Sequence, residues 1–165
     1  MNQSIHTIQF EEYNDTAGLN EEDAALLSTA RNVTADAYAP YSHFHVGAAA
    51  RLENGTIVTG TNQENASYPV GICAERVLLS VVASQHKNTP IDTIAVSYNH
   101  VGGESAHPVA PCGMCRQSLV EFETRMGRPI RLILSGQHGK VLIVKEANQL
   151  LPLAFLKTEL DGSKR

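Results

Sequence analysis

The sequence contains few cysteines, no tryptophan and no long apolar run. Three cysteines in 165 residues are an odd number, which disfavours a disulfide framework and favours metal-binding or catalytic roles. No apolar segment approaches the roughly 20 residues that span a bilayer, and residues 1–15 are polar without a hydrophobic signal segment. These absences predict a soluble, cytoplasmic protein that does not bind membranes.

Basic residues are also scarce. Lysine and arginine number 13 against 17 aspartates and glutamates, which gives a formal net charge of −4. A broad basic surface that attracts nucleic-acid phosphates is therefore not expected. The length of 165 residues and a hydrophobic content of 42% suit one compact domain. We predict a single domain over residues 1–165, in which residues 1–19 form an N-terminal extension.

Helix and strand patterns alternate along the chain. Asn20 followed by three acidic residues is typical of a helix N-terminus, and the Asn54-Gly55 pair between two strand-like runs is a strong hairpin signal. We expect helices at 21–39, 73–84, 112–126 and 145–151, strands at 46–52, 56–60, 91–97, 130–134 and 140–144, and a short strand at 5–10 in the extension. This order predicts an α/β fold with three α/β/α layers, in which helices cover both faces of a mixed sheet of about five strands.

All three cysteines lie in two short motifs at the starts of predicted helices, CAER at 73–76 and PCGMCRQ at 111–117. Cys112 and Cys115 are three residues apart, so both sulfurs can point toward one ion, and a helix N-terminus stabilises thiolates. Cys73 has the equivalent place in its own helix. Three thiolates form a tetrahedral Zn²⁺ site with an open fourth position, which is typical of catalytic zinc. Taken alone, the CxxC pair is also compatible with a redox pair or with buried thiols.

Two charged residues next to Cys73 complete this pattern. Glu75 can reach a water at the open position without being a ligand, as a general base must. Arg76 can donate hydrogen bonds to the ligand sulfurs from outside the ligand set and, with the helix dipoles, offset their negative charge. A glutamate two residues after the first ligand, followed downstream by P-C-x-x-C, is the signature of zinc deaminases, in which three cysteines are an accepted ligand set.

Longer motifs extend this match. They are AYAPYS at 37–42, FHVGAA at 44–49, NQENASY at 62–68 and LLPLAF at 150–155. With these motifs the chain resembles the cytidine deaminase family, specifically its small zinc enzymes, which form homotetramers and use three cysteine ligands. The resemblance covers nearly everything from the first helix onward. It implies one Zn²⁺ per chain and hydrolytic deamination of cytidine and deoxycytidine to uridine and deoxyuridine, with release of ammonia, in pyrimidine salvage.

The resemblance also assigns substrate contacts. Asn62 and Glu64 would hold the ribose hydroxyls, and an amide and a carboxylate two residues apart on an extended segment do face the same side. Phe44 matches the aromatic residue that packs against the pyrimidine, and Tyr68 matches a pocket tyrosine. The backbone N–H of Ala74 would hold the pyrimidine carbonyl oxygen.

Phe155 resembles the C-terminal aromatic residue that, in the family, closes over the active site of a neighbouring subunit. The resemblance therefore implies a homotetramer with shared sites, although a hydrophobic anchor within the same domain fits the sequence equally well. Residues 1–19 and the loop 99–110 look longer than the corresponding family segments.

Three alternatives stay open on the sequence. The nearest is a relative that deaminates another aminopyrimidine nucleoside, such as a nucleoside antibiotic. The second is a structural zinc module, which needs a fourth ligand that His107 could in principle supply. The third is editing of nucleic acid, which needs a positive groove that a net charge of −4 does not favour.

Overall fold

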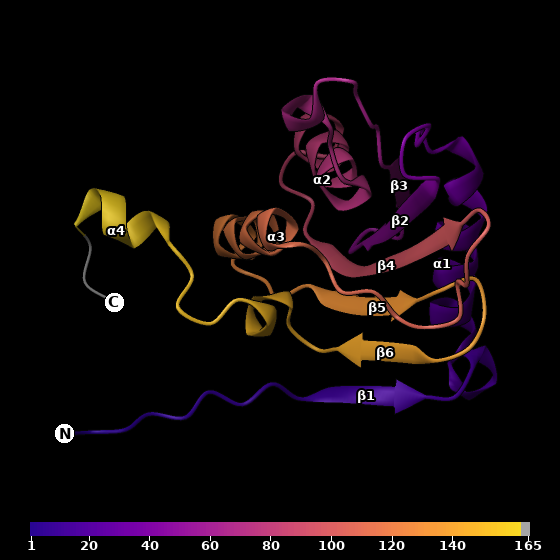
Figure 1. Cartoon of the computed structure of the whole chain (residues 1–165). Coiled ribbons are helices and arrows are strands. Elements are labelled where there is room, and N and C mark those ends of the chain that lie inside the picture. The colour runs from indigo at the N-terminus through magenta and orange to yellow at the C-terminus, as the bar shows by residue number, and fades with distance from the viewer. Residues whose placement is uncertain (163–165) are drawn as a thin grey trace.

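A six-stranded mixed sheet forms the middle of the computed structural model, which describes residues 1–162 (Figure 1). The strands are β1 (Phe10–Tyr13), β2 (Phe44–Leu52), β3 (Ile57–Thr61), β4 (Ile91–His100), β5 (Arg131–Ser135) and β6 (Val141–Val144). Their order across the sheet is β1-β6-β5-β4-β2-β3, and β4 and β5 are the one parallel pair among the described strands. The predicted three-layer α/β/α fold is confirmed, with six strands where about five were expected.

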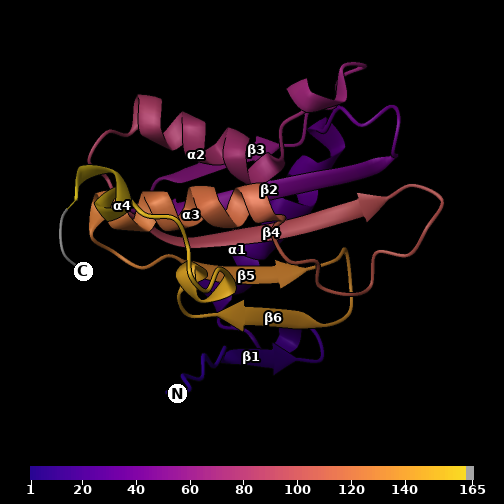
Figure 2. The same ribbon diagram turned by 60° about the vertical axis from the view of Figure 1, so that its left-hand side comes forward.

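Helices cover both faces of this sheet. They are α1 (Glu21–Asn32), α2 (Ala74–Gln85) and α3 (Gly113–Met126), and a short helix near the C-terminal end, α4 (Lys157–Asp161), lies away from the sheet (Figure 1). α1 packs on β2 and β4 from one side, whereas α2 and α3 lie next to each other on the opposite side (Figure 2). No helix in residues 1–162 is long and apolar enough to cross a membrane.

The central strands place their side chains alternately in two apolar cores, because successive residues of a strand point to opposite faces. Ile94 of β4 and Leu132 of β5 belong to the core under α2 and α3, together with Leu78 of α2. The next residue along each strand, Ala95 and Ile133, packs in the core under α1. Burial on both faces explains why the middle of each strand, residues 94–96 of β4 and 132–134 of β5, is continuously apolar.

The N-terminal extension adds an edge strand to the sheet. β1 pairs antiparallel with β6, so that Phe10 lies opposite Val144 and Tyr13 opposite Val141. The strand predicted at 5–10 was therefore wrong, since the strand begins at Phe10. Ile5 is 92% exposed, whereas Tyr13 packs against the core under α1. Pairing with β6 and burial of the tyrosine, and not local alternation, decide where this strand forms.

The start of α1 is confirmed, and its end differs from the prediction. Asn20 caps the helix, because its side-chain oxygen accepts a hydrogen bond from the Asp23 backbone N–H at 2.9 Å. The helix ends at Asn32, short of the expected end at 39, and a 3-10 helix follows. The Thr34 hydroxyl donates to the Arg31 carbonyl at 2.7 Å, a local bond that competes with continuation of the helix.

The remaining elements agree with the prediction within a few residues, except at the C-terminal end. The β2–β3 hairpin turns at Gly55, which has a φ of 83°, as the Asn-Gly signal predicts. The helix predicted at 145–151 is a shorter 3-10 helix at Ala147–Leu150, and α4 was not predicted. In Figure 1 the segment that carries α4 projects away from the sheet.

Gly60 on β3 determines how closely α2 approaches the sheet. A Cβ atom at this position would lie 2.6 Å from the Leu78 nitrogen and 2.7 Å from the Ala74 carbonyl oxygen. The backbone of α2 therefore rests directly on β3, which only a glycine permits at this spacing. This contact places the first turn of α2, and Cys73 just before it, at the edge of the sheet.

A buried carboxylate joins α3 to the C-terminal part of the sheet. Glu123 of α3 is buried, and its Oε1 accepts hydrogen bonds from the backbone N–H groups of Ile130 at 2.7 Å and Ala147 at 3.0 Å. Its Oε2 accepts from the Asn148 N–H at 3.1 Å. One side chain thus satisfies backbone donors from two separate segments.

We expect Glu123→Ala to lower the free energy of unfolding by about 2–4 kcal/mol, because it removes the acceptor of the Ile130 and Asn148 N–H groups. Urea denaturation at one fixed protein concentration measures this difference. Glu121→Ala is the matched control, since Glu121 lies exposed on the same helix, and it should change stability by less than about 0.5 kcal/mol. Equal stability of the two variants would contradict the assignment.

Candidate active site

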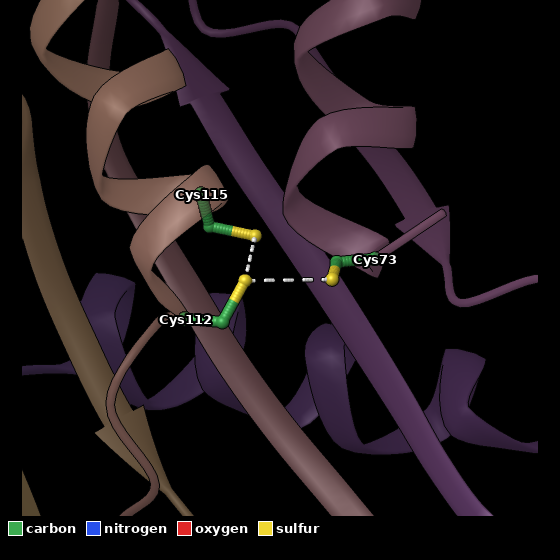
Figure 3. A group of neighbouring side chains, drawn as sticks. All are labelled: Cys73, Cys112 and Cys115. Carbon is green, nitrogen blue, oxygen red and sulfur yellow. Dashed lines mark hydrogen bonds between the residues drawn. The ribbon is translucent and has the colours of Figure 1, made fainter. Parts of the chain in front are cut away.

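The three cysteines meet where α2 and α3 begin. Cys73 and Cys112 are the N-cap residues of α2 and α3, and Cys115 lies in the first turn of α3. Their side chains point toward one another in Figure 3. The Sγ atoms of Cys73 and Cys112 are 3.7 Å apart, and those of Cys112 and Cys115 are 3.4 Å apart. All three are free thiols, since a disulfide would require a separation of about 2.05 Å.

The sulfur positions fit a zinc ion. With Zn–S bonds of about 2.3 Å, tetrahedral geometry separates two ligand sulfurs by about 3.8 Å. The three Sγ atoms lie within 4.8 Å of one another, and within residues 1–162 this is the one such group of three potential ligands. A tetrahedral ion at this point would have one position left for a ligand other than protein.

His107 does not complete this cluster. Its Nδ1 atom instead forms a hydrogen bond of 3.2 Å with the Tyr98 hydroxyl. The group of potential ligands in the described chain contains the three cysteines and no histidine. A closed, four-ligand structural zinc site is therefore not the arrangement that the geometry supports.

The surroundings of the cluster favour a thiolate at Cys73. Hydrogen bonding with Cys115 and Cys112, aided by the positive charge of Arg76, lowers the pKa of Cys73 to about 6. The same interaction with Cys73, together with burial, raises the pKa of Cys115. No hydrogen bond joins Arg76 to a sulfur in the described part of the chain, so its influence on the cluster is through charge.

Glu75 lies in the first turn of α2, two residues after Cys73, and only 5% of its surface is exposed. Burial raises the pKa of its carboxyl group. A carboxyl group with a raised pKa holds a proton more readily than an ordinary one, which suits it to both accept and donate a proton during a reaction. The geometry thus places a proton-transfer group beside the thiol cluster.

These groups share one cavity of about 490 Å³ at the ends of the parallel strands β4 and β5. Its volume suits a ligand of nucleoside size. Seven of the predicted site residues line it, namely Phe44, Asn62, Glu64, Tyr68, Cys73, Glu75 and Cys112. Cys115 and Ala74 lie buried directly behind this lining, at the starts of α3 and α2.

Asn62 and Glu64 are held at the cavity by backbone hydrogen bonds. The Asn62 amide bridges β2, accepting from the Val46 N–H at 2.7 Å and donating to the Phe44 carbonyl at 2.9 Å. Glu64 Oε2 accepts from the N–H groups of Tyr41 at 2.9 Å and Ser42 at 3.2 Å. Hydrogen bonding from Ser42 and these N–H groups lowers the pKa of Glu64, so its carboxylate stays charged.

The three aromatic residues predicted to contact the substrate differ in their position relative to the cavity. Phe44 lines the cavity, with its ring stacked on Tyr98 at a centroid distance of 4.7 Å. Tyr68 lies at the rim with 76% of its surface exposed, and its ring meets the edge of Tyr41. Phe155 is 59% exposed and does not line the cavity of its own chain, although its carbonyl accepts a hydrogen bond of 2.8 Å from Gln117.

The match to known proteins agrees with this site. The family model described as "Cytidine and deoxycytidylate deaminase zinc-binding region" matches residues 20–127, roughly two thirds of the chain. The chain belongs to this deaminase family. A cytidine deaminase of Mycobacterium tuberculosis is 39% identical to it over 143 residues, which are 85% of this chain and 94% of the relative.

Two further relatives of this deaminase indicate the range of the family. The crystal structure of cytidine deaminase from Burkholderia pseudomallei matches with a TM-score of 0.68 and 38% identity, covering 83% of this chain and 100% of that chain. A blasticidin-S deaminase of Bacillus cereus is 29% identical over 146 residues, which are 86% of this chain and 98% of the relative. Zinc is the cofactor of the family, and the three-cysteine cluster is the group in this deaminase that fits it.

Sequence reasoning missed part of the cavity wall of this deaminase. The structure adds Tyr98, Val109 and Ala110 to the lining. The predicted strand stopped at Ser97, whereas β4 continues to His100. The apolar alternation of Ile94 and Val96 extends to Tyr98 and could have indicated that its ring faces the same side.

We expect the purified deaminase to contain one zinc per chain, and Cys112→Ser to lose most of it on dialysis against a weak chelator. Cys112 is exposed, so this substitution tests the metal without opening a buried core. Elemental analysis gives the zinc content. Met114→Ala is the control, because this exposed residue lies between the two cysteines and should keep the metal. Full zinc content in Cys112→Ser would contradict the ligand assignment.

Proposed function

We propose that this deaminase hydrolyses cytidine and deoxycytidine to uridine and deoxyuridine, with release of ammonia. The observation that carries the proposal is the position of the thiol cluster and of the buried Glu75 at one cavity of nucleoside size. Relatives named cytidine deaminase, which align with most of the chain, support the same substrate. The overall reaction consumes one water and replaces the exocyclic amine of the pyrimidine by a carbonyl oxygen.

In this proposal Cys73, Cys112 and Cys115 hold the Zn²⁺. Held by these sulfurs, Zn²⁺ would act as a Lewis acid and lower the pKa of a water molecule for attack on C4 of the pyrimidine. The Glu75 carboxylate would accept one proton of the attacking water and deliver it to N3. It would then carry the second proton, from the hydroxyl added at C4, to the amine, while the C4–N bond breaks and the C4 carbonyl forms. The raised pKa of Glu75 suits both directions of transfer. The positive ends of α2 and α3, and the charge of Arg76, offset the charge of the thiolates.

The other residues bind and orient the nucleoside in this proposal. The N–H of Ala74, in the first turn of α2, has no partner within the helix and donates to the pyrimidine carbonyl oxygen. Phe44 packs against the base. Asn62 and Glu64 hold the ribose hydroxyls, for which a carboxylate that stays charged is a strong acceptor. Tyr68 contributes to the rim at the ribose end.

The charge of the cavity favours a nucleoside over a nucleotide or a nucleic acid. Among residues 1–162, its lining contains two carboxylates, Glu64 and Glu75, and no lysine, arginine or histidine. A 5′-phosphate or a phosphate backbone would therefore meet negative charge without a compensating cation. A modified aminopyrimidine nucleoside is the second candidate, because a blasticidin-S deaminase aligns with most of the chain. The pair Asn62 and Glu64 at the cavity favours an unmodified ribose or deoxyribose.

We further propose that the protein assembles into a homotetramer with sites shared between subunits, and that it serves pyrimidine salvage in the cytoplasm. The segment after residue 151 carries the exposed Leu153, Phe155 and Leu160. It projects from its own sheet in Figure 1. Large apolar side chains on a projecting segment are typical of a surface that another subunit covers.

We expect Glu75→Gln to keep its zinc but to lower kcat for cytidine by roughly 10²- to 10⁴-fold, because the proton carrier is lost. A steady-state ultraviolet assay with cytidine and deoxycytidine measures this, alongside elemental analysis. Glu121→Gln, on the exposed face of α3, is the control and should retain full turnover. Undiminished turnover in Glu75→Gln, or no turnover of either nucleoside by the zinc-loaded wild type, would overturn the proposal.

Complementation between two inactive variants tests the shared site. Glu75→Gln and Phe155→Ala, mixed under conditions that exchange subunits, should regain activity, because some sites then combine an intact Glu75 with a partner's intact Phe155. Sedimentation velocity should show a species of four copies of the 17.9 kDa chain. If mixed tetramers form without any recovery, Phe155 acts within its own chain or not at all.

A further inference from the structure

We propose that Tyr98 and His107 form a positioning pair that orients Phe44 and the cavity wall at Val109 and Ala110, and thereby sets how tightly the base is bound. This inference rests on the proposed function, since it concerns how the same cavity holds its nucleoside. Neither residue belongs to a motif that indicated the function.

The Tyr98 ring stacks on the ring of Phe44. Tyr98 is buried, and it lies on the same side of β4 as Ile94 and Val96, toward α2 and α3. Its ring is nearly parallel to that of Phe44, with an interplanar angle of 17° and a centroid distance of 4.7 Å. The His100 ring contacts Phe44 as well, at 5.8 Å. The side chain that we expect to meet the base is therefore one member of a stack of aromatic rings.

The Tyr98 hydroxyl also reaches the cavity wall. It forms a hydrogen bond of 3.2 Å with Nδ1 of His107, and the two rings meet edge to face at 5.8 Å. His107 lies only two residues before Val109 and Ala110, which line the cavity and lead to Cys112. Tyr98 thus contacts both Phe44 and the loop that leads to Cys112.

The first half of this loop has its own anchors. The Ser105 hydroxyl accepts a hydrogen bond from the His100 N–H at 2.9 Å, and its carbonyl accepts from the His138 N–H at 3.4 Å. A Cβ atom on Gly136 would overlap the Ser105 carbonyl oxygen, so the two loops pack backbone against backbone. These contacts fix the chain as far as residue 106.

The second half of the loop depends on Tyr98. Within the described chain, the Tyr98 hydroxyl is the one hydrogen-bond partner of residues 107–110. The next attachment is at Pro111, whose carbonyl accepts from the Arg116 guanidinium at 2.8 Å. Residues 107–110, of which Val109 and Ala110 line the cavity, are thus held by one hydrogen bond between two anchored parts of the loop. Loss of that point should loosen the wall without moving Glu75 or the cysteines.

The expected signature is a rise in KM at nearly constant kcat, because the pair affects binding of the base and not proton transfer. Tyr98→Phe keeps the ring and removes the hydroxyl, and should raise KM for cytidine about threefold to tenfold. Tyr98→Leu also removes the stacking on Phe44 and should raise KM further. His107→Leu should match Tyr98→Phe, whereas His107→Asn retains a polar nitrogen near the Nδ1 position and should restore KM to within about twofold of the wild type.

A double-mutant cycle separates a true pair from two independent defects. Tyr98→Phe combined with His107→Leu should raise KM no further than either change alone, since both remove the same bond. Tyr13→Phe is the matched control, because it removes a tyrosine hydroxyl hydrogen bond, to Glu11, on the distant β1 edge. It should leave KM and kcat unchanged. The pairing would be overturned if the effects on KM add in the double variant, or if Tyr98→Phe leaves KM unchanged. It would also be overturned if the single variants lose kcat and zinc together.

A binding measurement tests the same variants without turnover. It therefore distinguishes failure of the Tyr98–His107 pair from failure of the proposed function. Calorimetric titration of cytidine into zinc-loaded protein carrying Glu75→Gln gives a dissociation constant in each background. A weaker affinity with Tyr98→Phe and His107→Leu supports the pair even if the wild type deaminates neither nucleoside. Equal affinity in all backgrounds, with the wild type active on cytidine, overturns the pair and leaves the proposed function intact.

Discussion

The structure depends on one constraint, which is that the first turns of α2 and α3 must rest next to each other on the same face of the sheet. Gly60 allows the backbone of α2 to touch β3, and the crossover from β4 to β5 brings α3 beside it. Two helix N-termini then converge on one point, where both have free N–H groups and positive dipole ends. A cluster of thiols is stable there because these partial charges offset negative sulfur.

Two carboxylates at the cavity have opposite environments. Burial in the first turn of α2 raises the pKa of Glu75, whereas hydrogen bonds at the rim lower the pKa of Glu64. The first is suited to exchange a proton, and the second to remain a fixed acceptor for hydroxyl groups. Two glutamates thus suit two different purposes, because the environment of each side chain shifts the pKa of its carboxyl group in the opposite direction.

The local features of this fold were predictable from the sequence, and the features that depend on distant pairing were not. The cap at Asn20 and the turn at Gly55 depend on neighbours in the chain, so their patterns predicted them. β1 was placed wrongly because its partner β6 lies about 130 residues away along the chain. At the site, motif spacing predicted the meeting of the cysteines. The contact between Tyr98 and His107 depends on the path of a loop, for which no sequence pattern exists.

Because Cys73 lies far from the other two cysteines along the chain, the full set of three metal ligands forms only when the chain is completely folded. Cys112 and Cys115 stay close in any helical turn, but Cys73 is 39 residues from Cys112 and meets it only through the packing of α2 against α3. A partly folded chain therefore offers a bidentate site, whereas the native chain offers a tridentate one. By linkage, the difference in binding free energy between these two sites is added to native stability whenever the metal is bound. The cofactor needed for chemistry thereby also selects the correctly assembled tertiary structure over its incomplete forms.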